Sequence, residues 1–264
     1  MIHYPRIIGH RGGGALAPEN TLAGLALAAR LGCHGVEFDV ALTADEVPVL
    51  LHDATLERTT NGKGSLASKT AAEIATLDAG AKHHRAFARA TWPDEENNFD
   101  ASCGVPTFAA ALKACTVLGL WMNAEIKPTP GTEVQTGRIL ARLVADFYAQ
   151  HAAAPTSPAP RIVLSSFSTP ALQEAQRIAP AIPRALLVDN IPADWRAALA
   201  ACGATALHAA ATPANEKKLA PICNSGMPVA CYTVNDRTSA DRLFAAGVSA
   251  IFTDRLDLWQ AEEM

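Results

Sequence analysis

The feature that most restricts the fold of this chain is a regular alternation between short apolar runs and Ala-rich stretches with helical spacing. The apolar runs predict strands near residues 6–10, 35–40, 120–126, 161–166, 184–188, 205–208, 228–234 and 249–253. The Ala-rich stretches predict helices near residues 19–31, 107–118, 132–150, 169–178, 193–201, 213–225, 236–246 and 256–262. Eight strands, each followed by a helix, match the count of an α/β (β/α)8 TIM barrel.

A doubly wound parallel sheet is the alternative, since it also alternates strands and helices. Such a sheet is not expected to carry functional side chains at both early and late strands. We therefore favour a single barrel domain over residues 1–264.

A ninth apolar run, at residues 47–52, does not fit the parallel count. Only Thr43-Ala44-Asp45-Glu46 separates it from the preceding strand, which is too short for a parallel crossover. A β-hairpin arm is the available solution. A turn centred between Ala44 and Asp45 would pair residues whose numbers sum to 89, so that His52 faces Glu37.

About fifty residues of mixed character follow, before the helix predicted near residue 107. This length is unusual for a barrel connection, and it predicts a small inserted lobe at about residues 53–105 over the barrel mouth.

Several predicted strands lead directly into titratable groups. These transitions read Ile7-Ile8-Gly9-His10-Arg11, Gly35-Val36-Glu37-Phe38-Asp39, Val49-Leu50-Leu51-His52-Asp53 and Met122-Asn123-Ala124-Glu125-Ile126-Lys127. An unpaired buried ion costs several kcal/mol, so ordinary core strands do not carry such groups repeatedly. The pattern indicates a catalytic site at the strand ends.

Glu37 and Asp39 lie two residues apart on one strand, so both side chains point to the same face. Two such close carboxylates repel each other unless a cation or a shared proton intervenes. With Glu125 from the next barrel strand, three oxygen donors converge, and an all-oxygen site suits Mg²⁺ or Ca²⁺. The alternative is a salt-bridged cluster with Arg11 or Lys127, which three acids at neighbouring strand ends disfavour.

His10 and His52 are the natural acid and base pair, because histidine exchanges protons near neutral pH. Arg11 and Lys127 add positive charge that would neutralise and orient a phosphate. His208, at another predicted strand end, is a candidate to line the pocket. The glycines at 12–14 fit either a phosphate cradle or a tight turn before the helix.

Charge and composition narrow the choice of partners and compartment. The net charge of −4 argues against a nucleic-acid binder. The sequence contains no apolar run of about 18 residues, so we expect no membrane span. The N-terminus lacks the basic and apolar blocks of a signal peptide. The six cysteines have no metal-finger spacing and are typical of a reducing cytoplasm. The oligomeric state stays open, with a homodimer as one option.

Together these residues resemble the glycerophosphodiester phosphodiesterase family, in its compact bacterial cytoplasmic form. The matching motifs are His10-Arg11-Gly12, Pro18-Glu19-Asn20-Thr21, Glu37-Phe38-Asp39, His52-Asp53 with Thr55-Leu56 and Arg58-Thr59-Thr60, Glu125-Ile126-Lys127-Pro128, Ser165-Ser166-Phe167, Thr233-Val234-Asn235 and Thr253-Asp254. They occur in order over about 250 of the 264 residues, and their combination is highly specific. Tyr232 departs from the family, in which a tryptophan is common at this position, and residues 78–103 carry no family motif.

The resemblance implies a (β/α)8 barrel with an inserted lobe and one divalent cation, Mg²⁺ or Ca²⁺. Carried over by motif, Glu37, Asp39 and Glu125 would bind the metal, and His10 and His52 would act as acid and base. Arg11 and Lys127 would hold the phosphate, while Phe167 and Tyr232 join His208 as candidates for the pocket wall. The implied reaction is hydrolysis of a glycerophosphodiester to sn-glycerol 3-phosphate and an alcohol. Either water or the glycerol 2-hydroxyl fits as the nucleophile, and either histidine fits as the acid.

Three other functions fit parts of this pattern. A lipid phosphodiesterase of the phospholipase C or sphingomyelinase D type would need an apolar rim, for which Phe87, Trp92 and Phe99 are the available residues. A non-catalytic phosphodiester-binding barrel is disfavoured by the complete set of histidines and acids. A barrel lyase or isomerase with a phosphate handle needs only one base and leaves the second histidine unexplained.

Overall fold

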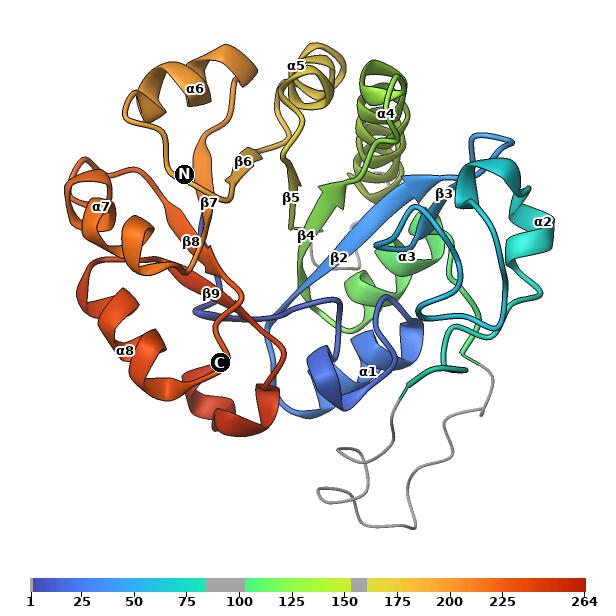
Figure 1. Cartoon of the computed structure of the whole chain (residues 1–264), viewed down its shortest axis with the longest axis horizontal. Coiled ribbons are helices and arrows are strands. Elements are labelled where there is room, and N and C mark those ends of the chain that lie inside the picture. The colour runs from blue at the N-terminus through green and yellow to red at the C-terminus, as the bar shows by residue number, and fades with distance from the viewer. Residues whose placement is uncertain (1, 84–102, 153–160) are drawn as a thin grey trace.

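A closed barrel of parallel strands forms the centre of the molecule in the computed structural model, which describes residues 2–83, 103–152 and 161–264. Its eight strands are β1 (Ile7–Gly9), β2 (Gly35–Leu42), β4 (Trp121–Ile126), β5 (Ile162–Ser166), β6 (Arg184–Val188), β7 (Ala206–Ala210), β8 (Val229–Tyr232) and β9 (Ala250–Thr253). β1 pairs with β9 on one side and with β2 on the other, which closes the ring. The predicted TIM barrel is confirmed (Figure 1).

Helices cover the outside of the barrel, as Figure 1 shows. They are α1 (Leu22–Arg30), α3 (Phe108–Val117), α4 (Glu133–Ala152), α5 (Thr169–Ile178), α6 (Trp195–Cys202), α7 (Pro213–Cys223) and α8 (Arg237–Ala245). Six of them begin with a side chain that accepts a hydrogen bond from a free backbone amide of the first turn: Thr21, Thr107, Ser168, Asp194, Thr212 and Asp236. The helix predicted at residues 256–262 is wrong, because that segment forms two 3-10 turns, Leu256–Leu258 and Ala261–Glu263.

Alternation along the strands separates the core into two regions. On β2, Val36, Phe38 and Val40 pack outward against the helices, so Glu37 and Asp39 face the barrel interior. A small apolar cluster fills part of that interior: Ile8, Trp121, Val163, Ala185, Ala206, Ala230, Ala250 and Phe252. The carboxylates therefore lie next to this apolar cluster, in the half of the barrel towards the carboxyl ends of the strands.

The predicted hairpin exists, but its predicted register is wrong by one residue. β3 (Pro48–Leu50) pairs antiparallel with β2 so that Val40 faces Leu50, a sum of 90 instead of 89. The cause is a three-residue loop in which Glu46 adopts a left-handed φ of 62°. His52 consequently does not face Glu37, and the Leu51 amide bonds to the Asp39 carbonyl instead.

The segment after β3 forms a packed region beside the barrel, at the right of Figure 1, with the short helix α2 (Ala71–Ile74). Its apolar side chains make a cluster of their own: Ala41, Val49, Leu51, Leu56, Leu66, Ile74, Ala79 and Val105. The insertion predicted at about residues 53–105 remains a prediction, because residues 84–102 lie outside the described residues. Phe87, Trp92 and Phe99 fall in that gap.

Within the described ranges, the structure has no helix long and apolar enough to cross a membrane.

Candidate active site

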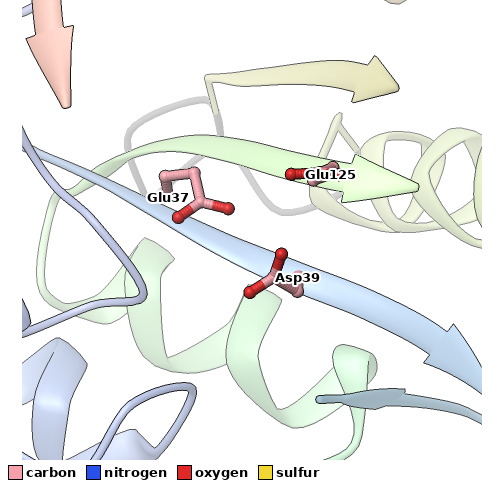
Figure 2. A group of neighbouring side chains, drawn as sticks. All are labelled: Glu37, Asp39 and Glu125. Carbon is pink, nitrogen blue, oxygen red and sulfur yellow. The ribbon is translucent and has the colours of Figure 1, made fainter. Parts of the chain in front are cut away.

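Three buried carboxylates meet inside the barrel. Glu37 and Asp39 rise from β2, and Glu125 rises from β4, where it pairs in register with Asp39 (Figure 2). One oxygen from each acid lies within 4.8 Å of the other two. The structure therefore brings together the three acids that the sequence singled out as metal ligands.

The charge balance at this cluster favours a cation. Burial, followed by the charge of Asp39, raises the pKa of Glu37 to about 8 and that of Glu125 to about 7. Oε1 of Glu37 is buried and has no hydrogen-bond partner among the residues that the structure describes. A buried carboxylate oxygen without a hydrogen-bond donor is a suitable ligand for a hard divalent cation. The residues present thus fit a divalent metal ion.

Two basic side chains reach the same cluster from its edge. Lys127, which follows β4, places Nζ 2.9 Å from Glu125 Oε1 and 3.4 Å from Asp39 Oδ1. Arg11 lies 3.5 Å from Asp39 Oδ2 through Nε, and its amide donates to Glu37 Oε2 at 2.8 Å. Although burial would raise the pKa of Asp39, Lys127 and Arg11 outweigh it and hold that pKa below its usual value. Ion pairing therefore satisfies Asp39 and leaves Glu37 short of positive charge.

Each predicted catalytic histidine is held by an aspartate through Nδ1. His10, after β1, lies 2.7 Å from Asp254 Oδ1, and His52, after β3, lies 2.6 Å from Asp53 Oδ1. Because a carboxylate accepts at Nδ1, the Nδ1–H tautomer is favoured and Nε2 is left for proton exchange. Nε2 of His10 lies 3.9 Å from Glu37 Oε2, so this histidine borders the acid cluster.

The two histidines differ in electrostatic environment. Burial would lower the pKa of His10, but the hydrogen bond to Asp254 and the charge of Glu37 outweigh it, so this pKa is raised. Burial lowers the pKa of His52, and the nearby Asp39 and Asp53 only partly oppose the shift.

The glycine-rich loop after β1 is a tight turn rather than a phosphate cradle. The amide of Gly12 donates to the Glu37 carbonyl, and that of Gly14 donates to the His10 carbonyl, so neither is free for a ligand. Gly14 has a φ of +61°, and a Cβ there would lie 2.4 Å from the Asp254 carbonyl oxygen. This glycine lets the loop lie directly on the backbone of Asp254.

Sequence reasoning missed the role of Asn20, which it named only as part of the motif Pro18-Glu19-Asn20-Thr21. Thr21 makes the cap, while the buried Asn20 amide donates to Asp39 Oδ2 at 2.9 Å and accepts from the Asp39 amide at 3.0 Å. No local pattern could show this contact, because it joins the loop before α1 to the middle of β2.

Asp254 carried no predicted role either, although it follows a strand like the other charged site residues. Its Oδ2 accepts from Asn235 at 2.9 Å, and the Asn235 oxygen accepts from the Asp254 amide at 2.8 Å. Its place at a strand end was the signal that could have identified it.

Sequence reasoning also missed a connected group of ion pairs beside the two site loops, formed by Glu19, Asp53 and Arg58 with Arg11.

The three predicted pocket residues lie in two different places. Phe167 is 45% exposed, its ring packs edge-on against Tyr232 at 6.1 Å, and Lys127 Nζ lies 5.9 Å from its centre. His208 is instead fully buried, with Nε2 2.8 Å from the hydroxyl of Tyr4, and burial lowers its pKa to about 3. Phe167 and Tyr232 thus form an aromatic wall near Lys127, whereas His208 lies in the apolar interior.

A cavity of about 940 Å³ opens beside the histidine and arginine of the first loop. His10, Arg11, Glu19, Arg58 and Asp254 contribute to its lining. The cavity is large enough for a small organic phosphate next to the charged cluster.

The chain is similar to known proteins over nearly its full length. The model of the glycerophosphoryl diester phosphodiesterase family matches residues 10–258. A glycerophosphodiester phosphodiesterase of Caldanaerobacter subterraneus subsp. tengcongensis is 29% identical over 253 residues, which cover 94% of this chain and 93% of that protein.

Two solved structures are similar over nearly the full length. One is an Oleispira antarctica phosphodiesterase in complex with the product sn-glycerol-3-phosphate, with a TM-score of 0.84, 30% identity, and coverage of 98% of this chain and 97% of the other. The other is a glycerophosphodiester phosphodiesterase from Agrobacterium tumefaciens, with a TM-score of 0.70, 26% identity, and coverage of 97% and 98% respectively.

Proposed function

The chain belongs to the glycerophosphoryl diester phosphodiesterase family, and on this basis we propose that it hydrolyses glycerophosphodiesters to sn-glycerol 3-phosphate and an alcohol such as choline, ethanolamine or glycerol. The observation that carries the proposal is the grouping of three buried acids with two aspartate-bound histidines at one end of the barrel. The product bound to the similar Oleispira antarctica enzyme supports the choice of substrate class.

Glu37, Asp39 and Glu125 would hold one divalent cation, Mg²⁺ or Ca²⁺. The unpartnered oxygen of Glu37 and the raised pKa values of Glu37 and Glu125 support this assignment. When bound, such a cation withdraws charge from the phosphoryl oxygens and neutralises the charge that develops on them.

His10 and His52 would move the protons of the reaction at Nε2. One takes a proton from the nucleophile, and the other gives a proton to the departing alkoxide. Asp254 and Asp53 hold the rings by Nδ1 at 2.7 Å and 2.6 Å, which keeps the proton-exchanging nitrogen available to substrate.

Arg11 and Lys127 would orient the phosphate. Both side chains are about one-fifth exposed, so an anionic group can reach them while most of each side chain stays buried, and Arg11 also lines the cavity. The aromatic wall of Phe167 and Tyr232 would contact the glycerol carbons beside Lys127.

Two nucleophiles fit this arrangement, water and the glycerol 2-hydroxyl. The second route forms a cyclic phosphate that is hydrolysed afterwards. A single-turnover sample examined by ³¹P NMR separates them, since the cyclic product has its own resonance and is absent from the direct route.

The test is release of glycerol 3-phosphate from glycerophosphocholine and glycerophosphoethanolamine, measured with EDTA, with Mg²⁺ and with Ca²⁺. His52→Ala and His10→Ala are the variants, and His208→Ala, away from the acid cluster, is the matched histidine control. We expect cation-dependent release that each of the first two variants reduces by about 10²–10⁴-fold. The control should retain activity on folded protein.

Release that persists in EDTA at the full rate would contradict the metal assignment. Absence of release with either cation, together with hydrolysis of phospholipid vesicles, would replace the proposal with the lipid phosphodiesterase alternative.

The domain and compartment assignments are part of the same proposal. We take residues 1–264 as one catalytic domain with an insertion at about 53–105, in the cytoplasm. Cys33, Cys115, Cys202, Cys223 and Cys231 are free thiols, which is typical of a reducing compartment. Sedimentation of the purified chain distinguishes a monomer from a homodimer.

A further inference from the structure

Arg58 joins two loops that carry different parts of the site. It lies in the segment after β3, and its partner Glu19 lies 39 residues earlier, in the loop before α1. All four carboxylate oxygens of Glu19 and Asp53 accept from this one guanidinium, at 2.6–3.0 Å. A guanidinium that binds two carboxylates in this way has a fixed orientation relative to both.

Each of these carboxylates also binds a residue of the proposed chemistry. Oδ1 of Asp53 lies 2.6 Å from His52 Nδ1, and Oε1 of Glu19 lies 3.0 Å from Arg11 Nη1. One continuous chain of contacts therefore runs from His52 through Asp53, Arg58 and Glu19 to Arg11.

We propose that Arg58 is a positioning residue that fixes the His52 imidazole and the Arg11 guanidinium relative to each other, through Asp53 and Glu19. This inference rests on the proposed function for the meaning of that geometry. His52 must present Nε2 to the substrate while Arg11 binds the phosphate, so an error in either position misaligns proton transfer with the phosphorus atom.

The chemistry of the contact requires arginine in particular. A lysine would supply the same charge, but its single ammonium group cannot bind two carboxylates in parallel. The burial pattern is also suitable: Glu19 and Asp53 are 21% and 27% exposed, so they are partly shielded from water, while Arg58 covers them from the rim at 46%.

The experiment compares Arg58→Gln and Arg58→Lys with Arg177→Gln, in steady-state release of glycerol 3-phosphate. Arg177 is the matched control, because it makes a similar two-point contact with Glu174 on the outer helix α5. We expect Arg58→Gln to lower kcat by about 10–100-fold and to raise KM, as loss of a residue behind a catalytic group does. Arg58→Lys should recover only part of kcat, and Arg177→Gln should match the unsubstituted chain.

Two further substitutions test the two carboxylates that Arg58 binds. Asp53→Asn should mainly lower kcat, because Asp53 holds His52. Glu19→Gln should mainly raise KM, because Glu19 holds Arg11. Combining either with Arg58→Gln should cost less than the product of the single effects, since each pair belongs to one network. Fully multiplicative effects would overturn the inference.

A readout independent of activity keeps this inference apart from the proposed function. In ¹H–¹⁵N spectra of the imidazoles, with His52 assigned by its absence in His52→Gln, the unsubstituted chain should show one Nδ1–H tautomer that Arg58→Gln loses. Failure of the unsubstituted chain to release glycerol 3-phosphate would reject the proposed function. The spectra would still show whether Arg58 fixes the tautomer of His52. A folded Arg58→Gln variant with unchanged kcat, KM and His52 signals would overturn the positioning role.

Discussion

At the scale of single residues, the amide of Asn20 is the clearest case of a side chain whose role only the folded structure reveals. It makes two hydrogen bonds with one residue, Asp39, and thereby fixes the orientation of a proposed metal ligand. Charged residues at strand ends could be predicted from sequence, because burying charge is costly and therefore informative. Asn20 could not, because a neutral amide beside a helix start has the ordinary explanation of a cap.

Asn20→Ala should weaken the affinity for Mg²⁺ or Ca²⁺ by about 10–100-fold, because Asp39 loses the partner that orients it. Isothermal titration of the metal-free protein measures this change. Asn215→Ala is the control: it removes another buried amide, which bonds to Ile191, Asp189 and Ala210. Each variant should lose about 1–3 kcal/mol of stability, but only Asn20→Ala should lose metal affinity; equal affinities would contradict the role of Asn20.

The raised pKa values of Glu37 and Glu125 predict an unusual pH dependence of stability. In the metal-free protein these groups hold protons up to pH about 8 and about 7, whereas in the unfolded chain they release them near 4.5. The native state then binds more protons than the unfolded state between these values, so the free energy of unfolding falls as pH rises, by up to about 1.4 kcal/mol per pH unit per group.

Urea unfolding at pH 5, 6, 7 and 8 with EDTA measures this slope. Saturating Mg²⁺ or Ca²⁺ should reduce the loss of stability, because a bound cation stabilises the ionised carboxylates. The variant Glu37→Gln should have a shallower slope in EDTA. A metal-free protein whose free energy of unfolding rises from pH 5 to pH 8 would contradict the raised pKa values of Glu37 and Glu125.

At the scale of elements, the sequence predicted all eight barrel strands and seven of the helices that the structure describes. Apolar runs and helical spacing identify buried elements well, because burial imposes those patterns. Two features depended on more than the pattern. The hairpin register follows from the left-handed conformation of Glu46, in a loop whose sequence, Ala44-Asp45-Glu46, contains no glycine to indicate it. The final segment supplies too little apolar spacing to hold a full helix and forms 3-10 turns.

The turn after β1 offers a test at this scale. Gly14→Ala should destabilise the protein and lower activity, because its Cβ would meet the backbone of Asp254 at 2.4–2.6 Å and displace the acid that holds His10. Gly64→Ala is the matched control: Gly64 also has a positive φ, +89°, but no atom of the described residues lies within 4 Å of the added carbon.

Gly64→Ala should cost about 1 kcal/mol for its backbone conformation alone and leave kcat unchanged. Gly14→Ala should cost more and lower kcat. Thermal unfolding and steady-state rates of both variants check this, and equal effects on kcat would show that the approach of the turn to Asp254 does not matter for catalysis.

At the scale of the whole molecule, closure of the barrel turns distant sequence segments into one site. β1 pairs with β9 across more than 240 residues, and this pairing brings Asp254 to His10. The strand count predicted closure, and closure alone implied that charged residues at strand ends would converge. The contacts among Glu19, Asp53 and Arg58 depend on how two long loops meet above the barrel, which no periodicity in the sequence encodes.

The proposed hydrolysis is tested by ³¹P NMR of glycerophosphocholine incubated with the purified chain, first in EDTA and then with added Mg²⁺ or Ca²⁺. We predict no change in EDTA and, after addition of the cation, replacement of the diester resonance by that of sn-glycerol 3-phosphate. Appearance of phosphocholine instead would show that the opposite ester bond is cleaved. A diester that stays unchanged with folded protein and either cation would contradict the proposed function.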